Sequence, residues 1–360
     1  MATASTRTVR TVIKAKTLRN CLPKRARRAS GFFAYARILA ICAVAAFLMP
    51  MSPVAAQDTG APAAARICVI VPHFKDEYWL SVGFGLHTAA EETGAELLTY
   101  ESGGYHSLER QIELLDICRA EGAQAILLGA VSADDARLIQ AVVETEKHVP
   151  VLALVNALDA PGLAGWVGVD WRKMGLAVGA FLSSRHPKGS EPVRAVLVTG
   201  PTESGWGPIL DSGLAEGLKN SSLNIVETYR ADTGLREQLR QVERALAEYP
   251  DADYLIGSAP AVEGAMALLR RHGNDTRAPR LLATYISHSV LRGLKRGQVE
   301  MVPFDDPIAQ GRLGLKLALR SIEGERFPGL SGPRTIAVEA GSRTIDRIGL
   351  SPSAFFPELE

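Results

Sequence analysis

The stretch R-I-C-V-I-V-P-H-F-K-D-E-Y-W-L, at residues 66–80, contains the unit from which most of the chain is built. Its first half is an uninterrupted apolar run rich in Val and Ile, which is typical of a strand covered on both faces of a parallel sheet. Its second half is a polar and aromatic loop. The residues that follow, up to Thr93, have the apolar spacing of a helix. The stretch therefore predicts a strand, a loop and a helix in succession.

The same unit recurs along the chain. The apolar runs are separated by stretches in which apolar residues have the spacing of a helix, as at 108–121, 171–185 and 235–249. Repeated strand–helix units predict an α/β fold with a doubly wound parallel sheet. Roughly 300 residues follow residue 65, too many for a single core of this kind, so we expect two such lobes. The further apolar runs stand at 95–100, 124–129, 150–155, 194–199, 224–229, 253–257, 280–285 and 299–303.

A loop rich in Gly, Pro and Ala, L-D-A-P-G-L-A-G at 158–165, marks the end of the first strand series. Strand–helix material at 288–322 follows a complete second series, and we expect it to return to the first lobe. Clefts between domains are preferred ligand sites, and in open α/β sheets ligands lie beyond the carboxyl ends of the strands. The predicted organisation is an N-terminal lobe of 66–168 plus 286–325, a C-terminal lobe of 169–285, and a crossing segment and tail of 326–360, with several segments forming a hinge.

Aromatic and acidic residues gather in the loops that follow the predicted strands. A group of Tyr and Trp rings facing a carboxylate suits a methylated cationic nitrogen through cation–π attraction. Sugars also stack on aromatic rings, so residue type alone leaves both ligand classes open. The candidate ligand-binding residues are Asp76, Tyr78, Trp79, Tyr105, Asp170, Trp171, Trp206 and Tyr285, the last in a predicted crossing at 284–288.

Signals for catalysis are weak. The sequence has no G-x-S-x-G, H-E-x-x-H or C-x-x-C motif, and its loop histidines show no metal-ligand spacing. The pair Asp305-Asp306 resembles two catalytic carboxylates, but one of them is explained as the N-cap of a helix that starts at Pro307. We therefore predict a binding protein that is not an enzyme and has neither a cofactor nor a metal.

The N-terminus has the pattern of a cleaved export signal. Residues 1–37 hold ten Lys and Arg and no acid, an apolar run extends from Ile38 to Met49, and V-A-A ends at Ala56. The apolar run is shorter than the roughly 20 residues of a spanning helix, and Pro50 and Pro53 would disturb such a helix. We predict a signal peptide at 1–56, export from the cytoplasm, and no membrane span in the mature protein.

Cleavage would change both the charge and the cysteine content. The full sequence has 40 bases and 39 acids; without residues 1–56 it has 30 and 39, a net charge of −9. A nucleic-acid-binding protein would be expected to carry a basic face, so this class loses support. Cys68 and Cys118 remain after cleavage. They are predicted at the same edge of one sheet, either as a disulfide or as two buried thiols.

Several short motifs resemble the TorT family of periplasmic sensors for trimethylamine N-oxide respiration. The motifs occur in the same order from residue 66 to the C-terminus, and they are specific only when taken together. They are P-H-F-K-D-E-Y-W-L-S-V (72–82), G-G-Y (103–105), G-V-D-W (168–171), R-H-P-K-G-S (185–190), D-Y-L-I-G-S-A (253–259), Q-G-R-L (310–313) and L-S-P-S (350–353).

The resemblance implies a type I periplasmic binding protein fold and a specific ligand. Members of the family bind trimethylamine N-oxide and act with the membrane histidine kinase TorS. Carried over by position, Asp76 is the acid beside an aromatic box of Tyr78, Trp79, Tyr105, Trp171 and Tyr285. The loop 200–208, with Trp206, departs from the family pattern, and we expect Trp206 to reshape the floor of the pocket. The alternative function is the solute-binding component of an ABC transporter for a sugar or a methylated amine.

Overall fold

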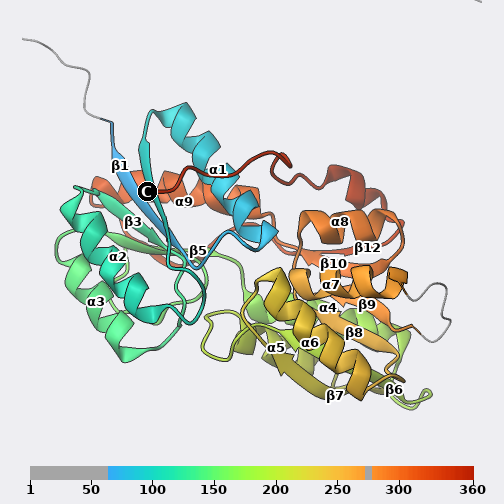
Figure 1. Ribbon diagram of the computed structural model, residues 1–360. Coiled ribbons are helices and arrows are strands. Elements are labelled where there is room, and N and C mark those ends of the chain that lie inside the picture. Colours follow the sequence, from blue (N-terminus) through green and yellow to red (C-terminus); the bar gives the residue numbers. More distant parts are fainter. Residues whose placement is uncertain (1–63, 272–277) are drawn as a thin grey trace, which may run out of the picture. The chain divides into compact units, whose positions relative to one another are not determined.

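The computed structural model describes residues 64–271 and 278–360 (Figure 1). These residues form two sheets, and the first sheet includes the N-terminal strand β1. The first sheet has the strand order β11-β5-β4-β3-β1-β2, and all its neighbouring strands are parallel. Its strands are β1 (Arg66–Val71), β2 (Glu96–Glu101), β3 (Ala125–Leu128), β4 (Val151–Val155), β5 (Gly165–Gly168) and β11 (Phe327–Ser331).

The second sheet repeats this order as β12-β10-β9-β8-β6-β7. Its strands are parallel except β12, which pairs with β10 in the antiparallel sense. The predicted fold class is therefore confirmed as two doubly wound, largely parallel sheets. The strands are β6 (Val193–Thr199), β7 (Leu223–Arg230), β8 (Tyr254–Gly257), β9 (Arg280–Ala283), β10 (Val299–Phe304) and β12 (Ile336–Glu339).

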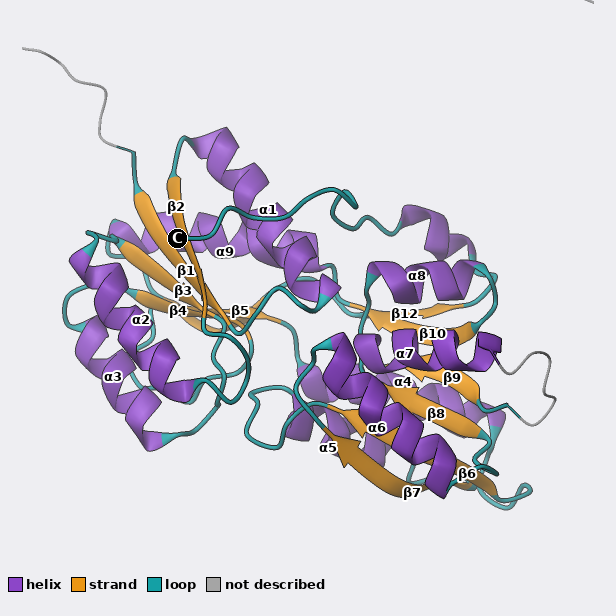
Figure 2. Cartoon of the chain, viewed as in Figure 1, coloured by secondary structure: helices purple, strands orange, loops and turns teal. Residues whose placement is uncertain are grey.

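Helices cover both faces of each sheet (Figure 2). In the first lobe, α1 (Glu77–Thr93) and α9 (Pro307–Ile322) pack together on one face, while α2 (Leu108–Ala120) and α3 (Ala136–Glu146) pack on the other. In the second lobe, α4 (Trp171–Arg185) packs against α5 (Gly207–Gly217). The opposite face holds α6 (Leu235–Glu248), α7 (Ala259–Arg271) and α8 (His288–Lys295), and η1 (Arg343–Arg347) contacts α8 and β12. This double covering explains why most strands read as continuous apolar runs.

One predicted boundary needs correction. The segment 286–325 was expected to return to the first lobe, but α8 and β10 stay in the second lobe because β10 is hydrogen-bonded between β9 and β12. Within the described residues, the chain passes between the lobes after β5, after β10 and between β11 and β12. After η1 the tail returns to the first lobe, where the N–H of Glu360 donates to the carbonyl of Thr99 in β2. The loop 284–288 is therefore not a crossing, whereas α9 packs on α1 and on strands of the first sheet.

Cys68 and Cys118 form a disulfide that joins β1 to α2, with their Cα atoms 5.8 Å apart. Both residues are fully buried in the core between the first sheet and the pair α2–α3. Of the two alternatives that the sequence left open, a disulfide and two buried thiols, the structure shows the disulfide.

The predicted signal peptide, 1–56, lies outside the described residues. In the part of the chain that the structure describes, none of the helices combines the length and the apolar character needed to cross a membrane.

Candidate functional site

A small cavity is formed by loops at the carboxyl ends of strands from both sheets. Its interior volume is only about 10 Å³, roughly the space that one water molecule needs, so the lining side chains almost fill it. Six aromatic side chains line it, each at most 4 % exposed. The site therefore suits a ligand of few atoms that is almost fully removed from water. The lining residues are Asp76, Tyr78, Trp79, Tyr105, Val155, Asn156, Trp171, Trp206, Thr233 and Tyr285.

The aromatic rings contact one another around this cavity. Tyr285 lies at the centre of the group, with its ring centroid 5.5 Å from those of Tyr78 and Trp206 and 6.2 Å from that of Trp171. These three pairs are close to perpendicular, at 80–85°, which is a favourable edge-to-face geometry. The rings thus form a packed wall with faces and edges turned toward the same small space.

Asp76 is the carboxylate of the cavity. It caps the N-terminus of α1 by accepting the backbone N–H of Tyr78 at 3.0 Å, and its other oxygen accepts the hydroxyl of Tyr285 at 2.6 Å. Burial raises the pKa of Asp76 to about 6, and the two hydrogen bonds oppose this rise. The bond between Asp76 and Tyr285 joins the loop after β1 in the first lobe to the loop after β9 in the second.

A second tyrosine–aspartate bond crosses between the lobes in the opposite direction. The hydroxyl of Tyr78, from the first lobe, donates to Asp305, which follows β10, at 2.7 Å. The amide of Gln310 also donates to Asp305 and to the Tyr78 hydroxyl, both at 3.0 Å. Burial raises the pKa of Asp305 to about 6. Asp305 does not line the cavity, so this pair supports the ring of Tyr78 from behind.

Tyr105 presents a hydroxyl with spare donor capacity. Its oxygen accepts the side-chain amide of Asn156 at 3.2 Å, and that amide also donates to the carbonyl of Ala130 at 2.8 Å. Burial raises the pKa of the Tyr105 hydroxyl, which keeps it protonated. The hydroxyls of Tyr78 and Tyr285, by contrast, already donate to carboxylates. Tyr105 is thus the tyrosine in the cavity best placed to donate a hydrogen bond to a ligand.

Backbone strain at the end of β4 places Trp171. Val155 has φ +66°, which is unusual for a β-branched residue, and the N–H of Asn156 bonds across it to the carbonyl of Leu154 at 2.7 Å. This tight turn leaves the carbonyl of Val155 to accept the indole N–H of Trp171 at 3.1 Å. The strain at Val155 therefore coincides with the wall of the cavity, where strained backbone is often functional.

Trp206 completes the cavity from the second lobe. Its ring lies 5.5 Å from that of Trp171, and Gly200 leaves the space that its indole occupies, because a Cβ at residue 200 would come within 2.2 Å of the ring. Residue 205 must likewise be glycine, since a Cβ there would meet the carbonyl of Ala157 at 2.2 Å. The loop that departs from the family pattern thus builds one wall of the site.

The structure brings together seven of the eight predicted ligand-binding residues and excludes Asp170. The side chain of Asp170 caps α4 by accepting the N–H of Lys173 at 3.2 Å, and it points toward a different groove beside Arg334. Asp306 is confirmed as the N-cap of α9, where it accepts the N–H of Ala309 at 3.0 Å. Short polar side chains that precede a helix satisfy its free N–H groups, and this accounts for both aspartates.

The predicted loop histidines do not meet. His73 contacts Asp232, His106 contacts Glu203, and His288 contacts the carbonyl of Ser351. Among residues 64–271 and 278–360, no group of three His, Cys, Asp or Glu side chains could hold a metal ion. The chemistry of the cavity is therefore that of aromatic faces, one carboxylate and a few hydrogen-bond donors.

Three residues of the lining were not predicted as ligand-binding: Val155, Asn156 and Thr233. Asn156 and Val155 end a predicted strand, so the rule that ligands lie beyond strand ends could have found them. Thr233 follows β7 after two intervening residues, and the sequence around it has no aromatic signal. Its place depends on the contact between the lobes.

A larger groove, with a volume of about 570 Å³, lies elsewhere in the first lobe between α1, β2 and the tail residues 354–358. Its lining comes from the first lobe and the tail alone. The aromatic cavity, although much smaller, is the better candidate site because side chains from both lobes converge on it.

Comparisons with known proteins agree with this geometry. Residues 67–326 match the family described as periplasmic binding protein domain. The periplasmic protein TorT of Escherichia coli K12 is 33 % identical over 298 residues, which cover 82 % of this chain and 84 % of that protein.

Two solved structures are similar in both sequence and fold. One is TorT in complex with the TorS sensor domain in the presence of trimethylamine N-oxide (TMAO). It has 36 % identity and a TM-score of 0.72, and the match covers 82 % of this chain and all of that one. The other is an ABC transporter solute-binding protein from Bradyrhizobium sp. BTAi1 with bound Bis-Tris, at 32 % identity and a TM-score of 0.68, covering 83 % and 90 %. The chain therefore belongs to the TorT family of periplasmic binding proteins, which are binding proteins and not enzymes.

Proposed function

We propose that this protein binds trimethylamine N-oxide in the aromatic cavity and passes the bound state to a TorS-like membrane histidine kinase, which controls trimethylamine N-oxide respiration. The observation that carries the proposal is the convergence of six buried aromatic rings and one carboxylate on one small cavity between the lobes. The TorT proteins to which the chain is similar were crystallised with the TorS sensor domain, with and without TMAO.

The ligand's chemistry matches the lining. Its methylated nitrogen is electropositive, and the faces of Trp and Tyr rings attract such a group, most strongly when water is excluded. Its oxygen is a strong acceptor, and the hydroxyl of Tyr105 is a donor that its bond from Asn156 leaves available. An ionised Asp76 cannot donate to that oxygen, so a bridging water would have to connect them.

Calorimetry with trimethylamine N-oxide tests the proposal directly. We expect heat of binding for the wild type and a loss of about 100-fold or more in affinity for Trp79→Ala and for Tyr105→Ala, because each removes a buried ring of the cavity. Trp166→Ala is the matched control, since Trp166 lies in β5 and does not line the cavity. A wild type that gives no heat with trimethylamine N-oxide but binds a sugar would contradict the proposal.

The second candidate function is transport. It is supported by the similar ABC transporter solute-binding protein, at 32 % identity, and this chain would then deliver a solute to a permease. Pull-down of the full-length mature protein with the periplasmic domain of a TorS-like kinase distinguishes the two functions. Retention, with or without ligand, supports signalling, whereas a neighbouring permease and ATPase in the genome, with no retention, supports transport.

The proposed location is the periplasm, after cleavage of the signal at 1–56. The support is the charge pattern of the N-terminus and the similarity to proteins named periplasmic. Mass spectrometry of the protein from the periplasmic fraction would show a mature N-terminus near Gln57. Recovery of the intact chain in the cytoplasm would contradict this location.

A further inference from the structure

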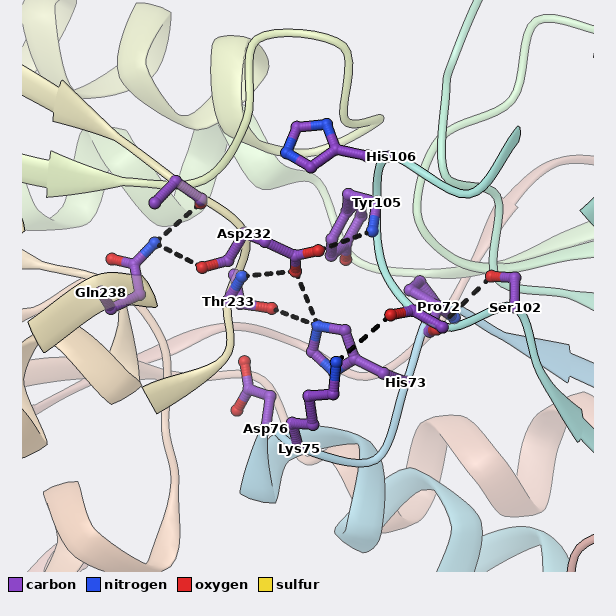
Figure 3. A network of polar contacts seen from close by, with 12 residues as sticks. Pro72, His73, Lys75, Asp76, Ser102, Tyr105, His106, Asp232, Thr233 and Gln238 are labelled. Carbon is purple, nitrogen blue, oxygen red and sulfur yellow. Dashed lines mark hydrogen bonds and ion pairs between the residues drawn. The ribbon is translucent and has the colours of Figure 1, made fainter. Parts of the chain in front are cut away.

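A second polar cluster joins the two lobes beside the aromatic cavity (Figure 3). Its centre is Asp232, in the loop after β7 of the second lobe, which is not among the residues that line the cavity. One carboxylate oxygen lies 2.8 Å from the ring nitrogen Nε2 of His73, which is fully buried after β1. The other oxygen accepts the backbone N–H of Tyr105 at 2.9 Å. A single carboxylate thus contacts two separate loops of the first lobe.

The backbone of the first lobe leaves room for the Asp232 carboxylate at Gly104. Gly104 has φ +150°, and a Cβ at this position would come within 2.4 Å of Asp232 Oδ2. Only glycine therefore allows the carboxylate to reach the N–H of the next residue, Tyr105. Lys75 donates to the carbonyl of Gly103 at 3.2 Å and supports the same turn.

The second lobe holds Asp232 in a fixed loop. The buried amide of Gln238 donates to the carbonyls of Thr199, Ala231 and Asp232 at 2.8–3.1 Å, and its oxygen accepts the hydroxyl of Ser258 at 2.9 Å. The N–H of Thr233 donates to Asp232 Oδ1 at 2.7 Å. The carboxylate is therefore placed before the lobes meet, and closure needs little further ordering of this loop.

The charge state of Asp232 favours strong bonds. Burial alone would raise the pKa of Asp232, but the hydrogen bonds from His73, Tyr105 and Thr233 outweigh it and bring the pKa below its ordinary value. Hydrogen bonds to an ionised acceptor are about twice as strong as neutral ones.

We propose that Asp232 is the clasp of the closed state: it holds the two lobes together and fixes Tyr105 against the cavity without touching the ligand. Because closure and ligand binding are coupled, anything that favours the closed state raises the apparent affinity. Asp232 is thus a positioning residue. The inference rests on the proposed function only in its choice of trimethylamine N-oxide as the probe.

The test compares Asp232→Asn with Asp251→Asn. Asp251 is an exposed carboxylate of the second lobe that pairs with Arg194 of the same lobe, so its change leaves the contact between lobes intact. Asn at 232 keeps the shape, but in either orientation of its amide an N–H faces a backbone N–H, that of Tyr105 or that of Thr233. We expect about a tenfold loss of affinity for trimethylamine N-oxide in Asp232→Asn and none in the control.

A distance measurement without ligand separates this inference from the proposed function. Spin labels on cysteines introduced at the exposed positions Glu113 and Glu243 report the spacing of α2 in the first lobe and α6 in the second. We expect Asp232→Asn to shift the distances toward longer values, while hydrogen exchange within each lobe stays unchanged. Distances equal to those of Asp251→Asn would overturn the inference, even if the wild type binds no trimethylamine N-oxide.

If Asp232→Asn fails to fold, Gly104→Ala tests the same contact from the first lobe, because its Cβ would displace the carboxylate. The same shift toward longer distances is expected. A folded Gly104→Ala variant with wild-type distances would overturn the inference.

Discussion

The two lobes share one topology but supply different chemistry to the cavity between them. Their strand orders correspond position by position, and in both sheets the functional side chains follow the carboxyl ends of the strands. The first lobe supplies Tyr78, Trp79 and Tyr105, whereas the second supplies Trp206 and Tyr285, and Trp171 begins the helix after the first crossing. The comparison teaches that a repeated scaffold fixes where the loops meet, while the loop sequences decide what each lobe supplies.

Each lobe also has a buried aspartate that accepts a hydrogen bond from a tyrosine of the other lobe. Asp76 of the first lobe accepts from Tyr285 of the second, and Asp305 of the second accepts from Tyr78 of the first. Each lobe therefore contains one donor and one acceptor of the pair. These bonds depend on the closed arrangement, and separation of the lobes would expose both aspartates to water.

The largest expected difference between the lobes concerns stability. The disulfide between Cys68 and Cys118 closes a loop with a sequence separation of 50 in the first lobe, and we find no counterpart in the described part of the second. Cys68→Ser/Cys118→Ser should lower the unfolding free energy of the first lobe by about 4 kcal/mol through loop entropy of the unfolded chain. Hydrogen exchange resolved by lobe measures this, with the second lobe as the internal control; equal loss in both lobes would show that they unfold as one unit.

The two buried aspartates predict a pH dependence. Their pKa values of about 6 lie above the 3.8 of the unfolded chain, so the folded protein binds more protons between pH 4 and pH 6. The unfolding free energy should therefore fall as the pH rises through this window, by on the order of 3 kcal/mol for each aspartate. Denaturation at several pH values should show a smaller slope for Asp76→Asn and for Asp305→Asn than for the exposed control Asp251→Asn. An unchanged slope in both would contradict the assignment.

The two tyrosine–aspartate hydrogen bonds between the lobes can be compared by removing one tyrosine hydroxyl at a time. Tyr285→Phe leaves Asp76 with only the backbone N–H of Tyr78, whereas Tyr78→Phe leaves Asp305 with the amide of Gln310. We expect Tyr285→Phe to cost about 1–3 kcal/mol of unfolding free energy and Tyr78→Phe to cost less, because a buried acceptor that loses its partner is penalised. Urea denaturation measures both, and the reverse order would show that Gln310 does not stabilise Asp305.

The smallest effect on the protein is expected when the indole ring of Trp206, in the second lobe, is displaced. Gly200→Ala would place a methyl group within 2.2 Å of the Trp206 ring and displace it from the cavity. One displaced aromatic face corresponds to about 1 kcal/mol, so the affinity for trimethylamine N-oxide should fall by about five- to tenfold. Calorimetry of Gly200→Ala beside Gly349→Ala, an exposed glycine with open space around its Cβ, tests this. An unchanged affinity would show that Trp206 packs on the site without contacting the ligand.

Sequence patterns predicted most of the fold because each signal was local. Nine apolar runs correspond to β1–β4 and β6–β10, and the loops after them contain the aromatic residues of the cavity. The strands β5, β11 and β12 were not predicted. The four residues of β5 are too few and too glycine-rich to give an apolar run. For β11 and β12 the reason is exposure. Their residues are mostly exposed or half-buried, as in F-P-G-L-S at Phe327–Ser331, and they lack the apolar run of a strand covered on both faces.

By itself, the sequence determined the α/β class, the aromatic character of the site and seven of its residues, because strand ends and residue types can be read along the chain. Only the tertiary structure decided the sheet to which β10 belongs, the disulfide, and the exclusion of Asp170. It alone brought Asp232 to Tyr105, residues separated by 127 positions. The physical reason is that hydrogen bonds and side-chain contacts between distant segments depend on how the sheets and lobes pack, which no local pattern encodes.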